Sequence, residues 1–123
     1  MLKVNSCEFN YQYGDQIHFP YRISSLVAYI KSRENLGNNF KFEKAFVLRE
    51  NVDEYIKECV DTDILLCSCY VWNWEITNFL AKEVKKLNPN CLIIFGGAQV
   101  PDFSIDFFKQ HTYVDILVHG EGE

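Results

Sequence analysis

The sequence has no long hydrophobic run and no dense cluster of basic residues. No segment reaches the roughly 18 to 20 apolar residues needed to span a bilayer, and residues 1–7 lack the apolar core of a signal peptide. The net charge is −5, whereas nucleic-acid binding requires clustered Lys and Arg. The lysines Lys82, Lys85 and Lys86 lie on one predicted helix, as on a solvated face. We therefore expect a cytoplasmic protein that binds neither membrane nor nucleic acid.

The motifs of common catalytic and nucleotide sites are also missing. Residues 96–101 (GGAQVP) match neither the dinucleotide fingerprint nor the P-loop, and residues 120–122 match only the first half of Gly-x-Gly-x-x-Gly. His18 and His111 have no Ser or Cys partner at the spacing of a hydrolase site. We expect no catalytic residue in this chain.

The five cysteines do not have the pattern of a disulfide framework or of a metal site. Their number is odd, and Cys59, Cys67 and Cys91 fall within apolar runs, where a free Cys behaves as a small hydrophobe. Cys67 and Cys69 lie on the same side of a predicted strand, but two further ligands at suitable spacing are missing. We expect buried free thiols and no metal ligands.

The pattern that is present is an alternation of apolar strands and amphipathic helices. The predicted strands are residues 2–5, 40–48, 64–69, 91–95 and 113–118. The predicted helices are residues 20–37, 51–60, 73–87 and 104–110, with Asn51 and Asn73 as N-caps and Asn51–Glu54 at capping-box spacing. This alternation predicts a doubly wound α/β fold, Rossmann-like or flavodoxin-like. We expect a five-stranded parallel sheet in the order 2-1-3-4-5 with helices on both faces.

Two of these strands are apolar throughout, which predicts that both of their faces are buried. Segments 64–69 and 91–95 are therefore expected at the centre of the sheet, in parallel pairing. Segment 113–118 is also apolar on both faces, but helix 104–110 can cover only one of them. We expect the other face and the outer edge to be exposed, and residues 1–123 to be one domain truncated before the next domain of a longer protein.

In open α/β sheets, ligands bind beyond the carboxyl ends of the strands, near the point where the strand order reverses. The loops expected there are residues 7–19, 69–73, 96–102 and 119–123. The loop after the third strand is large and aromatic, and Gly96 and Gly97 would let the backbone approach a ligand closely. The alternative is that the aromatic side chains pack beneath helices and the glycines only form a turn.

Four segments together resemble the N-terminal B12-binding domain of cobalamin-dependent radical S-adenosylmethionine (SAM) proteins. They are residues 18–21 (HFPY), 67–73 (CSCYVWN), 93–101 (IIFGGAQVP) and 114–123 (VDILVHGEGE). The resemblance covers nearly the whole chain and implies a corrinoid lying across the carboxyl ends of the strands. It implies that the cofactor-binding residues are Ser68, Cys69, Tyr70, Val71, Trp72, Gly96, Gly97, Ala98, Gln99, Val100, His119, Gly120 and Glu121.

The chain departs from the better-known corrinoid domains, which carry Asp-x-His-x-x-Gly, then Ser-x-Leu and Gly-Gly. Ser68 and the glycine pair are present, but His18 is one residue out of register with Asp15, and Tyr21 stands where Gly is expected. We therefore do not expect His18 to ligate cobalt.

The family's iron–sulfur motif, Cys-x-x-x-Cys-x-x-Cys, belongs to a following barrel domain, and no cysteines here have that spacing. The resemblance thus assigns S-adenosylmethionine and the [4Fe–4S] cluster to a radical SAM domain of the same parent chain, with methyl transfer as one possible reaction.

Two alternatives remain open. A flavodoxin-like nucleotide- or flavin-binding domain would use Ser or Thr in its first loop to hold a phosphate, and residues 8–19 contain neither and only one Gly. An interaction domain without a ligand is the other alternative, because the first-loop motif is degenerate.

Overall fold

The computed structural model describes residues 1–120 and contains a five-stranded parallel sheet. The strand order is β4-β1-β5-β6-β7, and every neighbouring pair is parallel. The strands are β1 (Leu2–Cys7), β4 (Phe40–Phe42), β5 (Ile64–Ser68), β6 (Leu92–Gly96) and β7 (Ile116–Leu117). Counting only these strands along the chain, the order is 2-1-3-4-5, so the predicted doubly wound topology is confirmed.

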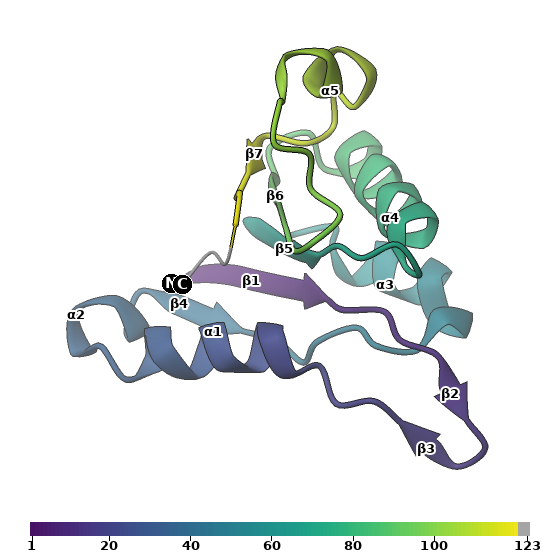
Figure 1. Ribbon diagram of the computed structural model, residues 1–123. Coiled ribbons are helices and arrows are strands. Elements are labelled where there is room, and N and C mark those ends of the chain that lie inside the picture. Colours follow the sequence, from purple (N-terminus) through teal and green to yellow (C-terminus); the bar gives the residue numbers. More distant parts are fainter. Residues whose placement is uncertain (121–123) are drawn as a thin grey trace.

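Helices lie on both sides of this sheet (Figure 1). They are α1 (Tyr21–Lys31), α2 (Glu34–Gly37), α3 (Val52–Glu58), α4 (Trp74–Leu87) and α5 (Ile105–Gln110), with a 3₁₀ turn η1 (Arg49–Asn51) before α3. α1 and α2 lie on one side, and α3 and α4 on the other. None of the helices within residues 1–120 is long and apolar enough to cross a membrane.

The main core lies between the sheet and the α3–α5 side. Successive strand residues point to opposite faces, so Leu65 and Cys67 of β5 join the buried cluster with Leu80 and Val84 of α4. On the other face Leu66 is only half-buried beside α1. The prediction that β5 and β6 are central is confirmed, but only one face of each is fully covered.

The edges of the predicted sheet are shorter than expected. The strand predicted at 40–48 ends at Phe42. Glu43 N donates to Val4 O, and Phe46 N donates to Ser6 O, so a step of three residues in this segment matches a step of only two on β1. This extra residue breaks the ladder, which resumes only as an isolated bridge between Cys7 and Phe46. β7 is likewise reduced to Ile116–Leu117, and Ile116 is 41% exposed, as expected for an uncovered fifth strand.

Three local predictions were wrong. The first loop contains an antiparallel hairpin, β2 (Gln12–Tyr13) and β3 (Gln16–Ile17), which turns at Gly14 with a φ of +59° and projects away from the sheet (Figure 1). The first helix breaks after Lys31, since Arg33 has an extended backbone before α2. Neither Asn51 nor Asn73 caps its helix through a side-chain hydrogen bond.

Candidate functional site

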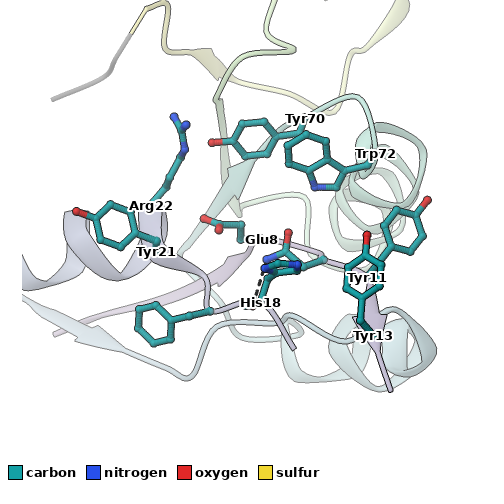
Figure 2. Close-up of a pocket in the computed structure, with 10 residues that line it drawn as sticks. Glu8, Tyr11, Tyr13, His18, Tyr21, Arg22, Tyr70 and Trp72 are labelled. Carbon is teal, nitrogen blue, oxygen red and sulfur yellow. Dashed lines mark hydrogen bonds between the residues drawn. The ribbon is translucent and has the colours of Figure 1, made fainter. Parts of the chain in front are cut away.

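Two cavities meet at the carboxyl edge of the sheet, next to the point between β1 and β5 where the strand order reverses. The aromatic cavity, about 420 Å³, is lined by Glu8, Asn10, Tyr11, Tyr13, His18, Phe19, Tyr21, Arg22, Tyr70 and Trp72 (Figure 2). The apolar cavity, about 540 Å³, is lined by Arg22, Ile23, Leu26, Ile30, Leu66, Cys67, Ser68, Ile94, Gly96, Gly97, Ala98, Val118 and Gly120. Arg22 lines both cavities, which therefore adjoin at the start of α1.

The structure divides the predicted site residues between these cavities. Tyr70 and Trp72 line the aromatic cavity. The apolar cavity takes Ser68, Gly96, Gly97, Ala98 and Gly120. The remaining predicted residues within 1–120 line neither cavity: Cys69 and Val100 are buried in the core, and Val71, Gln99 and His119 are exposed. Glu121 lies outside the described residues.

The loop after β5 presents a stacked aromatic pair to the first cavity. The rings of Tyr70 and Trp72 are parallel, with centroids 4.6 Å apart and an interplanar angle of 3°. Trp72 is 44% exposed, and its carbonyl accepts a hydrogen bond of 2.9 Å from Arg49. The guanidinium of Arg49 also lies 4.6 Å from the centre of the Tyr11 ring. Trp74, by contrast, packs into the core against Phe95. A flat, partly exposed aromatic surface thus borders the cavity.

The side chain of Asn73 holds this loop in place through hydrogen bonds to backbone atoms. Its side chain is fully buried; Oδ1 accepts a hydrogen bond from Tyr70 N at 2.8 Å, and Nδ2 donates to Ser68 O at 3.0 Å and to Phe9 O at 3.2 Å. These bonds join the ends of β1 and β5, and they explain why Asn73 is not available as the predicted helix cap. The residue positions Tyr70 instead.

Gly96, which ends β6, and Gly97, which follows it, have different roles. Gly97 has a φ of +106°, and a Cβ there would lie 2.8 Å from Cys69 N and closer still to Cys69 O. Only glycine therefore fits at this position beside the loop after β5. Two backbone hydrogen bonds hold the two segments together: Cys69 N donates to Gly96 O, and Gln99 N donates to Cys69 O. A Cβ on Gly96 would meet only Val118, at an ordinary 3.7 Å. Gly96 is the glycine that leaves space in the apolar cavity.

Sequence reasoning missed Glu8 and Arg22. Glu8 follows β1 directly and is only 5% exposed; its Oε1 accepts a hydrogen bond of 3.2 Å from Ile23 N in the first turn of α1. Arg22 holds its guanidinium 5.0 Å from the centre of the Tyr70 ring. A polar residue directly after a buried strand at the switch point is a signal that could have identified Glu8. Arg22 carries no local signal, because only the fold brings it to Tyr70.

Comparison with known proteins identifies relatives of this chain. No protein-family model matches it. It is 41% identical over 98 residues to the cobalamin-dependent radical SAM methyltransferase TokK of Streptomyces tokunonensis. It is 40% identical over 98 residues to a 2-(S-pantetheinyl)-carbapenam-3-carboxylate methyltransferase of Streptantibioticus cattleyicolor.

The chain is a homologue of part of these methyltransferases. The resemblance to cobalamin-dependent radical SAM proteins is therefore confirmed. Each match covers 80% of this chain but only 14% of the relative's length.

The thiols of this chain are buried in its core. All five cysteines are free and buried, as predicted. Burial raises the pKa of Cys59 to about 12 and that of Cys91 to about 11, and it also raises the pKa values of Cys67 and Cys69. With pKa values raised in this way, the thiols stay protonated at neutral pH and pack as small apolar groups. Within residues 1–120, no group of three or more His, Cys, Asp and Glu side chains could hold a metal ion.

Proposed function

We propose that this chain binds a corrinoid, cobalamin, at the carboxyl ends of β1, β5 and β6, as the cofactor module of a radical SAM methyltransferase. The observation that carries the proposal is the pair of adjoining cavities at the switch point, bordered by the stacked rings of Tyr70 and Trp72. The homology to a cobalamin-dependent radical SAM methyltransferase supports it.

The side chains present suit such a ligand. A corrinoid is a large, flat and partly apolar ring with polar groups around its rim, and ligand sites of this kind combine apolar walls with a few polar groups. Tyr70 and Trp72 offer a flat surface of matching character, and Leu26, Leu66 and Ile94 offer apolar walls in the neighbouring cavity. Arg22 lies where these two environments meet, and Glu8 lines the aromatic cavity. The chain would therefore bind and orient the cofactor and shield it from water.

The chemistry would be divided between this chain and the rest of the parent protein. When bound, a corrinoid supplies a cobalt atom that can carry a methyl group. We propose that S-adenosylmethionine and the [4Fe–4S] cluster are held by a radical SAM domain of the same parent chain, since radical cleavage requires suitably spaced cysteines.

A retention experiment tests this function. The purified chain is mixed with hydroxocobalamin, with FMN or with buffer alone, then desalted, and its visible absorption spectrum is recorded. We expect the corrinoid spectrum to stay with the protein. Retention of FMN alone would instead favour a flavodoxin-like domain, and retention of neither would favour an interaction domain; either result would contradict the proposal.

A further inference from the structure

Three polar side chains around the aromatic cavity have hydrogen-bonding capacity that the protein does not use. They are Glu8 at the end of β1, Arg22 at the start of α1 and Tyr70 after β5. Figure 2 shows the Tyr70 hydroxyl pointing toward the side of the cavity where Arg22 lies, with the Glu8 carboxylate beneath it. Elements distant in the sequence thus bring a donor, a cation and an acceptor together.

The Tyr70 hydroxyl is an unsatisfied group. The residue is 7% exposed, and its buried oxygen has no hydrogen-bond partner among the described residues. Such a group normally destabilises a fold, because its hydration is lost without replacement. The comparison within the chain is Tyr113, whose hydroxyl donates to Asn78 Oδ1 at 2.6 Å. Two other buried side-chain atoms, Asn5 Nδ2 and Thr77 Oγ1, also have no partner among the described residues. Of the three residues, Tyr70 is the one that lines a cavity, where a ligand could supply the partner.

Glu8 has unused capacity to accept hydrogen bonds, whereas Tyr70 has an unused donor. Its nearly buried carboxylate accepts the single hydrogen bond from Ile23 N, although a carboxylate offers about four acceptor sites. No ion pair among residues 1–120 includes Glu8 or Arg22. A buried carboxylate gains most from a ligand that donates hydrogen bonds to it.

We infer that Glu8, Tyr70 and Arg22 recognise a primary carboxamide on the ligand. The amide NH₂ would donate to Glu8, and the amide carbonyl would accept from Tyr70 or Arg22. Arg22 has an exposed side chain, which can turn off the Tyr70 ring as the ligand enters. This inference rests on the proposed function, because the rim of a corrinoid carries primary carboxamides. A carboxylate in the same place would lose the NH₂ donor and would face the carboxylate of Glu8. An ion pair with the exposed Arg22 would offset only part of this loss, so the cluster favours fully amidated corrinoids.

The test compares cobalamin with its monocarboxylic acids, in each of which one rim carboxamide is hydrolysed. Dissociation constants are measured for the chain by spectral titration. We expect at least one of the acids to bind about tenfold or more weakly than cobalamin, the scale of a lost charge-assisted hydrogen bond. Glu8→Gln should remove most of this discrimination, because a neutral amide does not repel the acid.

A second pair of variants separates recognition from folding. Tyr70→Phe should keep or raise the melting temperature while weakening cobalamin binding about threefold to tenfold, because it removes only an unpaired hydroxyl. The control, Tyr113→Phe, loses a made hydrogen bond and should lower the melting temperature without changing the affinity.

The outcomes test the carboxamide assignment separately from corrinoid binding itself. If wild type binds cobalamin and all the acids equally well, or if Glu8→Gln discriminates as strongly as wild type, the carboxamide assignment is wrong and corrinoid binding stands. If no corrinoid binds at all, both are wrong. Cobinamide keeps the rim carboxamides but lacks the nucleotide, so it should depend on Glu8 as cobalamin does. Dependence with cobalamin alone would place the contact on the nucleotide and overturn the assignment.

Discussion

At the scale of single residues, the two adjacent glycines of the site should respond differently to the same substitution. Gly97→Ala should lower the free energy of unfolding by about 2 to 4 kcal/mol, because an L side chain is strained at its positive φ and meets the Cys69 backbone. Gly96→Ala should change it by less than about 1 kcal/mol. Urea denaturation measures both. Equal losses would show that the approach of Gly97 to Cys69 does not constrain this loop.

Asn73 is expected to be the most sensitive polar residue of the site. Asn73→Ala leaves Tyr70 N, Ser68 O and Phe9 O without their partner, which should cost about 2 to 4 kcal/mol of stability. The exposed Asn90 provides the control, and Asn90→Ala should be nearly neutral. Thermal unfolding of the two variants checks this. An Asn73→Ala variant as stable as wild type would show that these three hydrogen bonds do not hold the loop in place.

The buried thiols predict how stability depends on pH. Burial raises the pKa of Cys59 from 9.0 to about 12 in the folded chain, so the folded state holds this proton more tightly than the unfolded state. Stability should therefore be unaffected by this group below pH 9 and should fall as the pH rises toward 12, where only the unfolded thiol ionises. Denaturation across this range, compared with Cys59→Ala, measures the effect. The variant should show a shallower decline, and identical slopes would be evidence against it.

The residues that line the two cavities were only partly predictable from the sequence. Tyr70 and Trp72 come shortly after the apolar strand β5, and Gly96 ends the apolar strand β6. They could be assigned to the cavities because the carboxyl ends of these strands share one edge. Cys69 and Val100 stand beside them in the sequence but turn into the core. The contact between Arg22 and Tyr70 depends on how α1 packs against the sheet, and no local pattern encodes that.

At the scale of elements, the central strands were predictable and the edge elements were not. β5 and β6 have unbroken apolar runs, and runs of this length are typical of central strands with both neighbours in the sheet. Phe46 and Val114 are as buried as residues of the central strands but lie outside regular strands. Apolar character alone therefore overestimated the lengths of β4 and β7. The β2–β3 hairpin escaped prediction because its residues are exposed and do not alternate.

That hairpin should matter for binding and not for folding. Residues 11–19 are all exposed, yet Tyr11, Tyr13 and His18 form one wall of the aromatic cavity. Replacing residues 12–17 with a short glycine linker should leave the far-UV circular dichroism spectrum and the melting temperature nearly unchanged. Corrinoid retention should fall sharply. Retention equal to that of wild type would show that the hairpin does not contact the ligand.

At the scale of the whole molecule, the fold is packed unequally on its two faces. The main core fills the side of α3, α4 and α5, whereas on the side of α1 the sheet borders an apolar cavity of about 540 Å³. The aromatic cavity opens beside it, and Arg22 stands between them. The packed face thus fixes the strand ends in place, and the open face and edge provide room for a large ligand.

The most direct test of this account is the amount of cobalt that the chain retains. The purified chain is dialysed against excess hydroxocobalamin, desalted, and analysed for cobalt and protein together. The account predicts a single corrinoid per chain, and much less for Trp72→Ala, which removes half of the stacked aromatic pair without reaching the core. A folded wild-type chain that retains no cobalt, or a Trp72→Ala variant that retains as much as wild type, would contradict it.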